Sequence, residues 1–292
     1  MTPILKVENL TKTINQFRLN ALSFTVQEGC ITGFIGKNGA GKTTTIKSLL
    51  GIYPMDSGRI LFRGKDMMKN SRMAMNEIGV VMDQGYFYEH LTLNEMKNIL
   101  APSYSHWDEV AFSEWVERFQ LDKHQKIEQL SRGMRIKYAL ALALSHHADL
   151  LIMDEPTSGL DPIMRSELMT ILRAFMNEEG KSVFFSTHIT SDLDKIADQI
   201  ILIDQGRLLF GEEKDSLLDS HIIVKGDNRW INSETRSLFI KLNQSSYGFD
   251  GLSQQREVIQ RLMPEAIIER PTIEDIMLAY VKGEEDHVTQ SR

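Results

Sequence analysis

The fold is decided by the stretch Gly36-Lys37-Asn38-Gly39-Ala40-Gly41-Lys42-Thr43. It follows an apolar run at residues 31–35 and precedes a helical pattern at residues 42–50, the setting that a phosphate-binding loop of this spacing requires. The glycines let backbone N–H groups wrap a phosphate, and the start of the helix adds partial positive charge. Lys42 is expected to reach the β- and γ-phosphates, and Thr43 offers a hydroxyl to Mg²⁺. The stretch therefore predicts a strand, a loop and a helix that bind a nucleotide.

A second stretch supplies two acidic side chains at the end of an apolar run, Leu150-Leu151-Ile152-Met153-Asp154-Glu155. Taken alone, the acidic pair could be the solvated end of a strand. Beside a phosphate-binding loop, the pattern places one carboxylate near Mg²⁺ and the next near the attacking water. We expect Asp154 to hold the metal and Glu155 to orient and polarise the water. The two stretches together indicate a nucleotide hydrolase.

The remaining patterns predict an α/β fold with an antiparallel β subdomain and a helical insertion. Apolar residues alternate with polar ones up to residue 26, as in a half-buried antiparallel sheet. Apolar strands at residues 183–186 and 200–203 alternate with helices after Pro162 and after Ile189, as in a doubly wound sheet. Residues 93–126 are helical in pattern and rich in aromatic side chains. They indicate an inserted helical subdomain.

The chain changes character after residue 210. We expect an ATPase-type domain at 1–211, with its helical subdomain at about 84–147, and a small α+β accessory domain at 212–292. Its predicted helices cover 254–262 and 273–281, and the second begins with a capping box of Thr272 and Asp275. We expect residues 283–292, which are polar and charged, to form a flexible tail.

Composition limits the possible partners. Hydrophobic residues make up 42% and charged residues 25% of the 292 residues, as in an ordinary globular protein. Lys and Arg number 33 against 40 for Asp and Glu, so the net charge of −7 argues against nucleic acid as a partner. The single cysteine, Cys30, excludes an internal disulfide. No apolar run approaches the roughly 20 residues that cross a bilayer, and the N-terminus does not resemble a secretory signal, so we expect a cytosolic location.

Three further motifs resemble those of the nucleotide-binding subunits of ABC transporters, and the resemblance covers roughly residues 5–210. Leu130-Ser131-Arg132-Gly133-Met134 is similar to the signature sequence of that family, just before a long apolar helix. Pro156-Thr157-Ser158-Gly159-Leu160-Asp161 resembles the D-loop, and His188 resembles the switch histidine that contacts the γ-phosphate. The resemblance implies a P-loop NTPase fold of the ABC type.

It also implies a site that two subunits build together. In this family the signature of one subunit closes on the γ-phosphate held by the other, so Ser131 and the backbone of Gly133 would complete a site in a second subunit. Lys42, Glu155 and His188 are the expected catalytic residues, and ATP and Mg²⁺ are the expected cofactors. The residues expected at the nucleotide are Phe17, Gly36, Lys37, Asn38, Gly39, Ala40, Gly41, Lys42, Thr43, Thr44, Ser131 and Gly133, and those expected at the metal are Thr43, Asp83 and Asp154.

The chain departs from the family pattern at three places. Arg132 replaces the usual glycine of the signature. Asp83, and not Gln84, falls at the Q-loop position, from which it could still reach Mg²⁺ or its water. Ile14 stands where an aromatic side chain normally stacks on adenine, which leaves Phe17 as the nearest aromatic candidate, with a place in the core as its alternative.

The resemblance implies a subunit that powers export through a separate transmembrane permease, at the cytoplasmic face of the cell membrane. The permease would dock on the helical subdomain, where Tyr86, Phe87 and Tyr88 either pack locally or receive a partner helix. The second ATPase subunit is expected to be an identical copy, although Arg132 keeps a heterodimer open. The alternative is a soluble ABC-type ATPase that acts as a regulatory switch without transport; the chain has neither the second cassette nor the heptads of such relatives.

Overall fold

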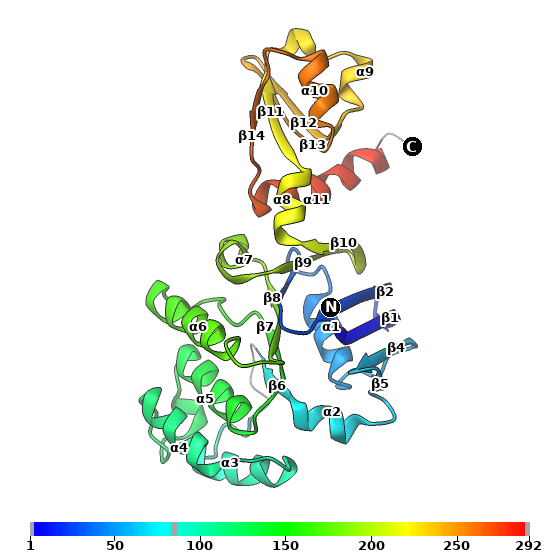
Figure 1. Cartoon of the computed structure of the whole chain (residues 1–292). Coiled ribbons are helices and arrows are strands. Elements are labelled where there is room, and N and C mark those ends of the chain that lie inside the picture. Colours follow the sequence, from blue (N-terminus) through cyan, green and yellow to red (C-terminus); the bar gives the residue numbers. More distant parts are fainter. Residues whose placement is uncertain (1–2, 83–86, 290–292) are drawn as a thin grey trace.

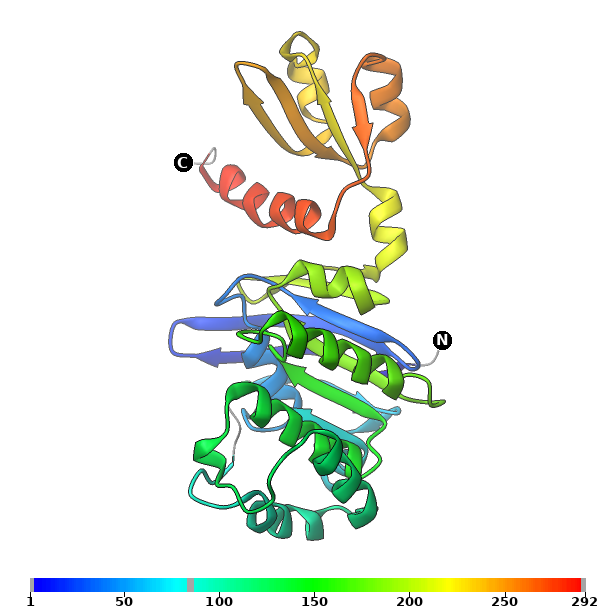
Figure 2. The ribbon, with the colours of Figure 1, turned by 90° about the vertical axis from the view of Figure 1, so that its left-hand side faces the viewer.

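The computed structural model describes residues 3–82 and 87–289. Figure 1 shows an elongated molecule with two sheets in its lower part and a third sheet at its upper end, above the helix α11 (Ile273–Thr289). Figure 2 shows the helices of residues 93–145, called the helical part below, at the end of the molecule opposite to the third sheet. No helix within the described ranges is both long enough and apolar enough to span a membrane.

The central sheet has six strands and carries the phosphate-binding loop. In spatial order the strands are β10 (Arg207–Glu213), β9 (Gln199–Asp204), β3 (Ile31–Ile35), β8 (Ser182–Thr187), β7 (Leu150–Asp154) and β6 (Ile78–Val81). All neighbouring pairs are parallel except β9 with β10, and every residue of β3, β7 and β8 is buried. Continuous apolar runs are typical of such fully covered strands. The strands expected from these runs are confirmed.

Helices cover both sides of this sheet (Figure 1). These are α1 (Lys42–Leu49), α2 (Ser71–Glu77), α6 (Pro162–Phe175) and α7 (Thr190–Ile196). Asp161 caps the N-terminus of α6 by accepting from the backbone N–H groups of Ile163 and Met164, and Pro162 occupies the first helical position. The helices expected after Pro162 and after Ile189 are therefore confirmed.

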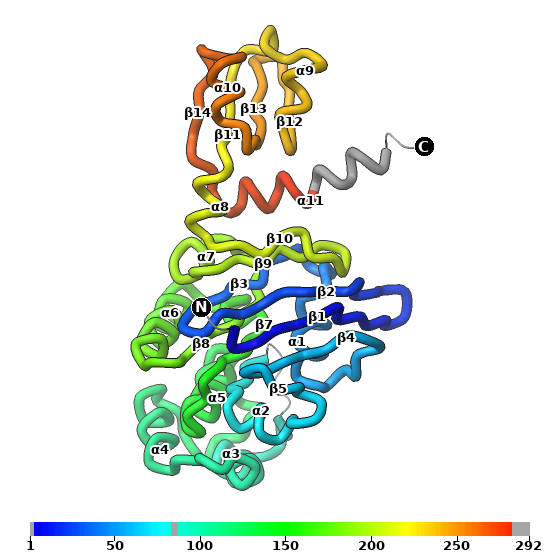
Figure 3. Tube along the Cα trace, turned by 45° about the vertical axis from the view of Figure 1, so that its right-hand side comes forward, coloured from blue at the N-terminus to red at the C-terminus, as the bar shows by residue number. Residues whose placement is uncertain are grey.

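A four-stranded antiparallel sheet packs beside the central one, on the side seen in Figure 3. Its order is β2 (Phe17–Gln27), β1 (Pro3–Ile14), β4 (Ser57–Phe62) and β5 (Lys65–Asp66). Phe24 of β2 stacks on Phe34 and Phe184 of the central sheet, with ring centroids 5.8 Å apart in both pairs. The half-buried antiparallel layer predicted at the N-terminus is present.

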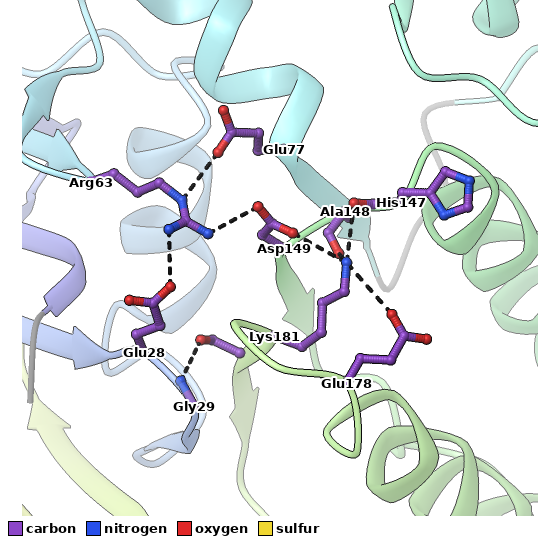
Figure 4. A network of polar contacts seen from close by, with 10 residues as sticks. Glu28, Gly29, Arg63, Glu77, His147, Ala148, Asp149, Glu178 and Lys181 are labelled. Atoms are coloured by element: carbon purple, nitrogen blue, oxygen red, sulfur yellow. Dashed lines mark hydrogen bonds and ion pairs between the residues drawn. The ribbon is translucent and has the colours of Figure 1, made fainter.

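A network of ion pairs joins the two sheets at the end of β7 remote from Asp154 (Figure 4). Arg63 donates to Glu28 at 2.9 Å, to Glu77 at 3.1 Å and to Asp149 at 2.9 Å. Lys181 reaches the other oxygen of Asp149 at 3.1 Å. One guanidinium therefore ties together the ends of three elements that lie far apart in the sequence.

The helical part consists of α3 (Leu93–Leu100), α4 (Glu109–Arg118) and α5 (Arg132–Ser145). Its centre is Tyr138, which is fully buried and donates its hydroxyl to the carbonyl of Leu93 at 2.8 Å. Phe87 packs edge-on against Tyr138 with centroids 5.2 Å apart, whereas Tyr88 is 57% exposed. Phe87 thus follows the local-packing alternative. Tyr86 lies outside the described residues.

The third sheet has the order β12 (Phe239–Ser245), β13 (Gly248–Ser253), β11 (Ile222–Gly226) and β14 (Ile267–Glu269), accompanied by α8 (Lys214–Ser220), α9 (Ser233–Arg236) and α10 (Arg256–Leu262). α11 packs against both α7 and β12, and the capping box at its start is confirmed by the hydrogen bonds of Thr272 with Asp275.

Two details of this region differ from the sequence interpretation. α11 runs to Thr289, where a tail was expected from residue 283. Glu and Asp are compatible with helix, so a polar composition does not by itself end one. The expected boundary at residues 211 and 212 falls inside β10, which leads directly into α8. The C-terminal unit, residues 214–289, therefore continues directly from β10, the edge strand of the central sheet.

Candidate functional site

The phosphate-binding loop joins β3 to α1 and packs closely against β9. A Cβ at Gly36 would lie only 2.4 Å from the carbonyl oxygen of Ile203, so the first position admits no side chain. Gly41 has φ +113°, a conformation that glycine adopts without strain. Lys42 is 5% exposed and folds back to donate to the carbonyls of Gly36 at 2.7 Å and Lys37 at 3.2 Å. Its ammonium therefore lies inside the curve of the loop.

A cavity of about 770 Å³ opens over this loop. Its volume falls within the range typical of small-molecule sites. Its lining residues are Ile14, Asn15, Gln16, Phe17, Asn38, Gly39, Gly41, Lys42, Thr43, Thr44, Tyr53, Glu155, Ser158 and His188. Nine of the residues predicted for the site are in this set. Gly36, Lys37 and Ala40 contribute to the loop without lining the cavity.

The carboxylate of Glu155 lies between the side chains of Lys42 and His188. Its Oε1 is 3.1 Å from Lys42 Nζ, and its Oε2 is 2.7 Å from His188 Nδ1. The backbone of Glu155 has φ +48°, and its N–H donates to Ser186 Oγ at 2.9 Å. The strained turn and this hydrogen bond aim the side chain into the cavity. The structure brings together Lys42, Glu155 and His188, the three residues that the sequence predicted as catalytic.

Asp154 lies deeper, at the end of β7. It is 3% exposed and accepts a hydrogen bond from Ser186 Oγ at 2.6 Å. It does not line the cavity, whereas the exposed Thr43 does. Within residues 3–82 and 87–289, no three His, Cys, Asp or Glu side chains are grouped as metal ligands. A hydroxyl and a carboxylate, as on Thr43 and Asp154, are oxygen donors that suit Mg²⁺, which takes few protein ligands and completes its shell with phosphates and water.

Comparison with known proteins agrees with this geometry. A family model described as ABC transporter matches residues 19–158. The bacitracin transport ATP-binding protein BcrA of Bacillus licheniformis is 36% identical over 212 residues, which are 72% of this chain and 69% of that protein. The chain belongs to the ABC transporter ATP-binding family. It is an ABC ATPase, which binds and hydrolyses ATP.

Two further matches locate the similarity. YhcH of Bacillus subtilis (strain 168), named as an uncharacterized ABC transporter ATP-binding protein, is 32% identical over 290 residues, or 97% of this chain and 92% of that protein. The similarity to YhcH therefore includes the C-terminal unit. A solved structure titled as an ATP binding subunit of an ABC transporter superposes with a TM-score of 0.67 at 25% identity, covering 74% of this chain and 92% of that one.

The ABC signature lies apart from the cavity. Ser131 caps α5 by accepting from the N–H of Met134 at 3.3 Å, and Gly133 is buried where a Cβ would lie 2.8 Å from Met164 Cε. Neither residue lines the cavity over the phosphate loop. Arg132 places its guanidinium against Gly159 of the D-loop, where a Cβ would lie 2.8 Å from Arg132 NH1. The substituted signature position thus contacts the D-loop of its own chain.

A hydrogen bond joins the D-loop to α7, the helix that begins two residues after His188. Thr157 Oγ1 donates to Asp192 Oδ2 at 2.6 Å, and Arg165 Nε donates to Asp192 Oδ1 at 2.5 Å. Asp192 is fully buried. Sequence reasoning did not identify this contact, because the three side chains come from three separate segments.

Several expectations remain to be placed. Asp83 and Gln84 lie outside the described residues. Phe17 satisfies both of its alternatives, since it lines the cavity and also packs on the core. Tyr53 and Ser186 were not predicted as site residues. Tyr53 lies in no recognised motif. Ser186 ends a predicted strand two residues before His188, but its contacts with Asp154 and Glu155 appear only in the folded chain.

Proposed function

We propose that this ABC ATPase powers export through a separate membrane permease by closing with a second copy of itself around ATP. The observation that carries the proposal is the position of Glu155 between Lys42 and His188 above the phosphate loop. This arrangement supplies a cation for the phosphates, a carboxylate for the water and an imidazole for the γ-phosphate. That placement supports the proposed residue roles.

The chain's own groups support a sequence of contacts. The γ-phosphate of ATP would replace Glu155 at Lys42, because both anions require the same ammonium. Glu155, released from Lys42, would then accept a proton from the attacking water. His188 would follow the γ-phosphate and remain within reach of Glu155. Mg²⁺, held through Thr43 and Asp154 with Asp83 as a further candidate, would neutralise the developing phosphate charge.

A second subunit is proposed because Ser131 and Gly133 do not reach the cavity of their own chain. Both could close a neighbouring cavity in a two-fold dimer, in which each chain supplies the same two surfaces. An identical partner is favoured because this chain carries both halves of the site. A heterodimer with a related chain is the alternative, and Arg132 is the residue that favours it.

Export, the permease and the location at the cytoplasmic face of the membrane are proposed from similarity. The bacitracin transport protein supports a role in transport. The permease would dock on the helical part, where Tyr88 is exposed. We further propose an ATPase domain and an accessory domain, as predicted at 1–211 and 212–292, with the division at the end of β10, because the residues after β10 include a small separate core around Val224, Phe249 and Ile259.

The test uses Glu155→Gln, which keeps the size of the side chain and removes the proton acceptor. ATP binding should persist while hydrolysis slows by about 10²-fold or more. This variant, loaded with ATP, is used as bait in gently solubilised membranes, with Lys42→Ala as the matched control that cannot hold ATP. Capture of a polytopic membrane protein with two copies of the chain supports the proposal. Capture of soluble partners alone would favour the regulatory switch instead.

A further inference from the structure

The residues that line the cavity are of two kinds. Lys42, Thr43 and Glu155 offer the charged and hydroxyl groups that suit phosphates. The lining also includes two other segments, residues 14–17 of the hairpin and Tyr53 from the loop between α1 and β4. A nucleotide whose triphosphate lies on the phosphate loop would place its base against these two segments. The side chains there determine how the base is held.

Phe17 already packs on the phosphate loop. A Cβ at Gly41 would lie 2.8 Å from Phe17 Cζ and 3.4 Å from its Cε1, so the edge of the ring lies on the loop backbone. Phe17 is also partly buried against the core of the antiparallel sheet. Its ring therefore lies close to the phosphate loop. Ile14, which pairs with Phe17 across the hairpin, has no ring to offer.

Tyr53 is the other aromatic ring in the lining, and the loop that carries it is held firmly. The N–H groups of Ile52 and Tyr53 both donate to the carbonyl of Lys47, at 2.9 Å and 3.1 Å. Three residues later, Asp56 accepts from the N–H of Thr13 at 2.7 Å. This contact holds the loop beside the hairpin, so that Tyr53 and Ile14 line one cavity.

The Tyr53 ring also has a cation near it. Lys47 Nζ lies 5.3 Å from the ring centroid, within the range of a cation–π contact. Such a contact restrains the ring, and a restrained ring loses less entropy when a ligand stacks on it. Tyr53 is partly buried, with its side chain contributing to the cavity wall.

We propose that Tyr53 is the residue that stacks on the nucleotide base and so supplies the preference for a purine nucleotide. The proposal rests on the ATP site described above. Base–aromatic stacking has a strength that corresponds to about a tenfold change in affinity for one ring. A purine offers a larger stacking surface than a pyrimidine, so the contribution is expected to be larger for ATP than for UTP.

The experiment measures binding by titration calorimetry in the full-length Glu155→Gln chain, which prevents turnover. The probes are Mg-ATP, Mg-UTP and Mg-tripolyphosphate, which has no base. Tyr53→Leu keeps apolar bulk and should weaken ATP binding about tenfold while leaving tripolyphosphate unchanged. Tyr53→Phe and Tyr53→Trp keep a ring and should retain ATP binding. Tyr247→Leu, which alters a tyrosine that is 99% exposed in the C-terminal unit, is the matched control.

The outcomes distinguish failure of the role of Tyr53 from failure of the ATP site itself. Equal weakening of ATP and tripolyphosphate by Tyr53→Leu, or no weakening of either, overturns the role of Tyr53 while the ATP site stands. Loss of ATP binding in Tyr53→Phe overturns it as well, since the ring is still present. Failure of the parent chain to bind both ATP and tripolyphosphate would instead overturn the nucleotide site itself. If Tyr53→Leu reduces the ratio of the affinity for ATP to the affinity for UTP, the result supports the purine preference.

Discussion

Lys42 contacts a carboxylate at the position where a bound triphosphate would place its own negative charge. The pair with Glu155 is 3.1 Å long, and both side chains are largely buried. This contact orients both side chains before the nucleotide enters. Ser186 is the buried residue that connects this pair to Asp154, the carboxylate proposed for Mg²⁺, since its hydroxyl contacts Asp154 and the N–H of Glu155.

The first prediction concerns Ser186. Ser186→Ala removes the acceptor of the Glu155 N–H and a donor to Asp154, so both carboxylates lose a fixed position. We expect kcat to fall by about 10- to 100-fold with a smaller change in KM, because misplacement of reacting groups affects mainly the chemical step. Steady-state ATPase assays measure both constants, and Ser186→Thr should restore part of the rate. A rise in KM at unchanged kcat would contradict this role.

The second prediction concerns His146, at the end of α5. Burial lowers the pKa of His146 to about 4, and its ring stacks on Tyr104 with centroids 4.0 Å apart. The unfolded chain therefore takes up a proton near pH 6.5, where the folded chain does not. Stability should fall as the pH drops from about 6.5 to about 4, by roughly 3 kcal/mol from this group.

Denaturant unfolding across that pH range measures the effect. His146→Phe keeps the stacked ring and removes the titrating group, so its stability should depend less on pH below about 6.5. Its stability at neutral pH is expected to be slightly lower, because the ring can no longer bond to the Asn76 carbonyl. The same pH dependence in parent and variant would show that another group is responsible.

At this scale the sequence predicted the residues that lie in contiguous motifs. Gly36 to Thr43 could be interpreted directly, because the loop and its ligand contacts are local. Tyr53 and Ser186 could not, because their roles depend on which loop folds beside the hairpin and which strand lies next to β7. Such contacts have no sequence spacing of their own.

Among the elements, the D-loop and α7 contact each other next to the site, because Thr157 follows Glu155 by two residues and α7 begins two residues after His188. Asp192 is fully buried and accepts from both Thr157 and Arg165. Loss of its charge leaves a largely buried guanidinium without its carboxylate, which is more costly than loss of an exposed pair. The third prediction is that Asp192→Asn lowers the free energy of unfolding by about 3 kcal/mol and increases hydrogen exchange in the D-loop.

Asp219→Asn provides the matched control. Asp219 pairs with Arg270 at 3.1 Å, but both side chains are mostly exposed, so the change should have little effect. Denaturant unfolding and amide exchange compare the two variants. Equal stability of the two would contradict the structural role of Asp192.

Strands were predicted better than helix ends. β3, β7 and β8 are covered on both faces, and full burial demands the continuous apolar runs that make them visible in the sequence. β12 and β14 are only partly buried and carry mixed side chains, so their pattern is weak. The predicted end of α11 was wrong, because residues such as Glu284 and Glu285 are as compatible with a helix as with a polar tail.

For the whole molecule, the seat of the C-terminal unit on the ATPase is the feature that no motif indicated. Ile273 and Ile276 of α11 are buried in the same apolar cluster as Leu193 and Ile196 of α7. The C-terminal unit therefore packs on the helix that begins two residues after His188. The capping box of Thr272 and Asp275 indicated the start of α11, but a local motif does not identify the surface that the helix covers.

In the proposed dimer, one chain holds the phosphates of ATP while a second copy closes over them. Complementation between two inactive variants tests this shared site. Lys42→Ala disables the phosphate loop and Ser131→Arg disables the signature, so each variant alone should be inactive. A two-fold dimer of one chain of each kind would contain one intact site. A 1:1 mixture should therefore recover about a quarter of the parent ATPase activity, whereas a mixture that stays inactive would contradict the shared site.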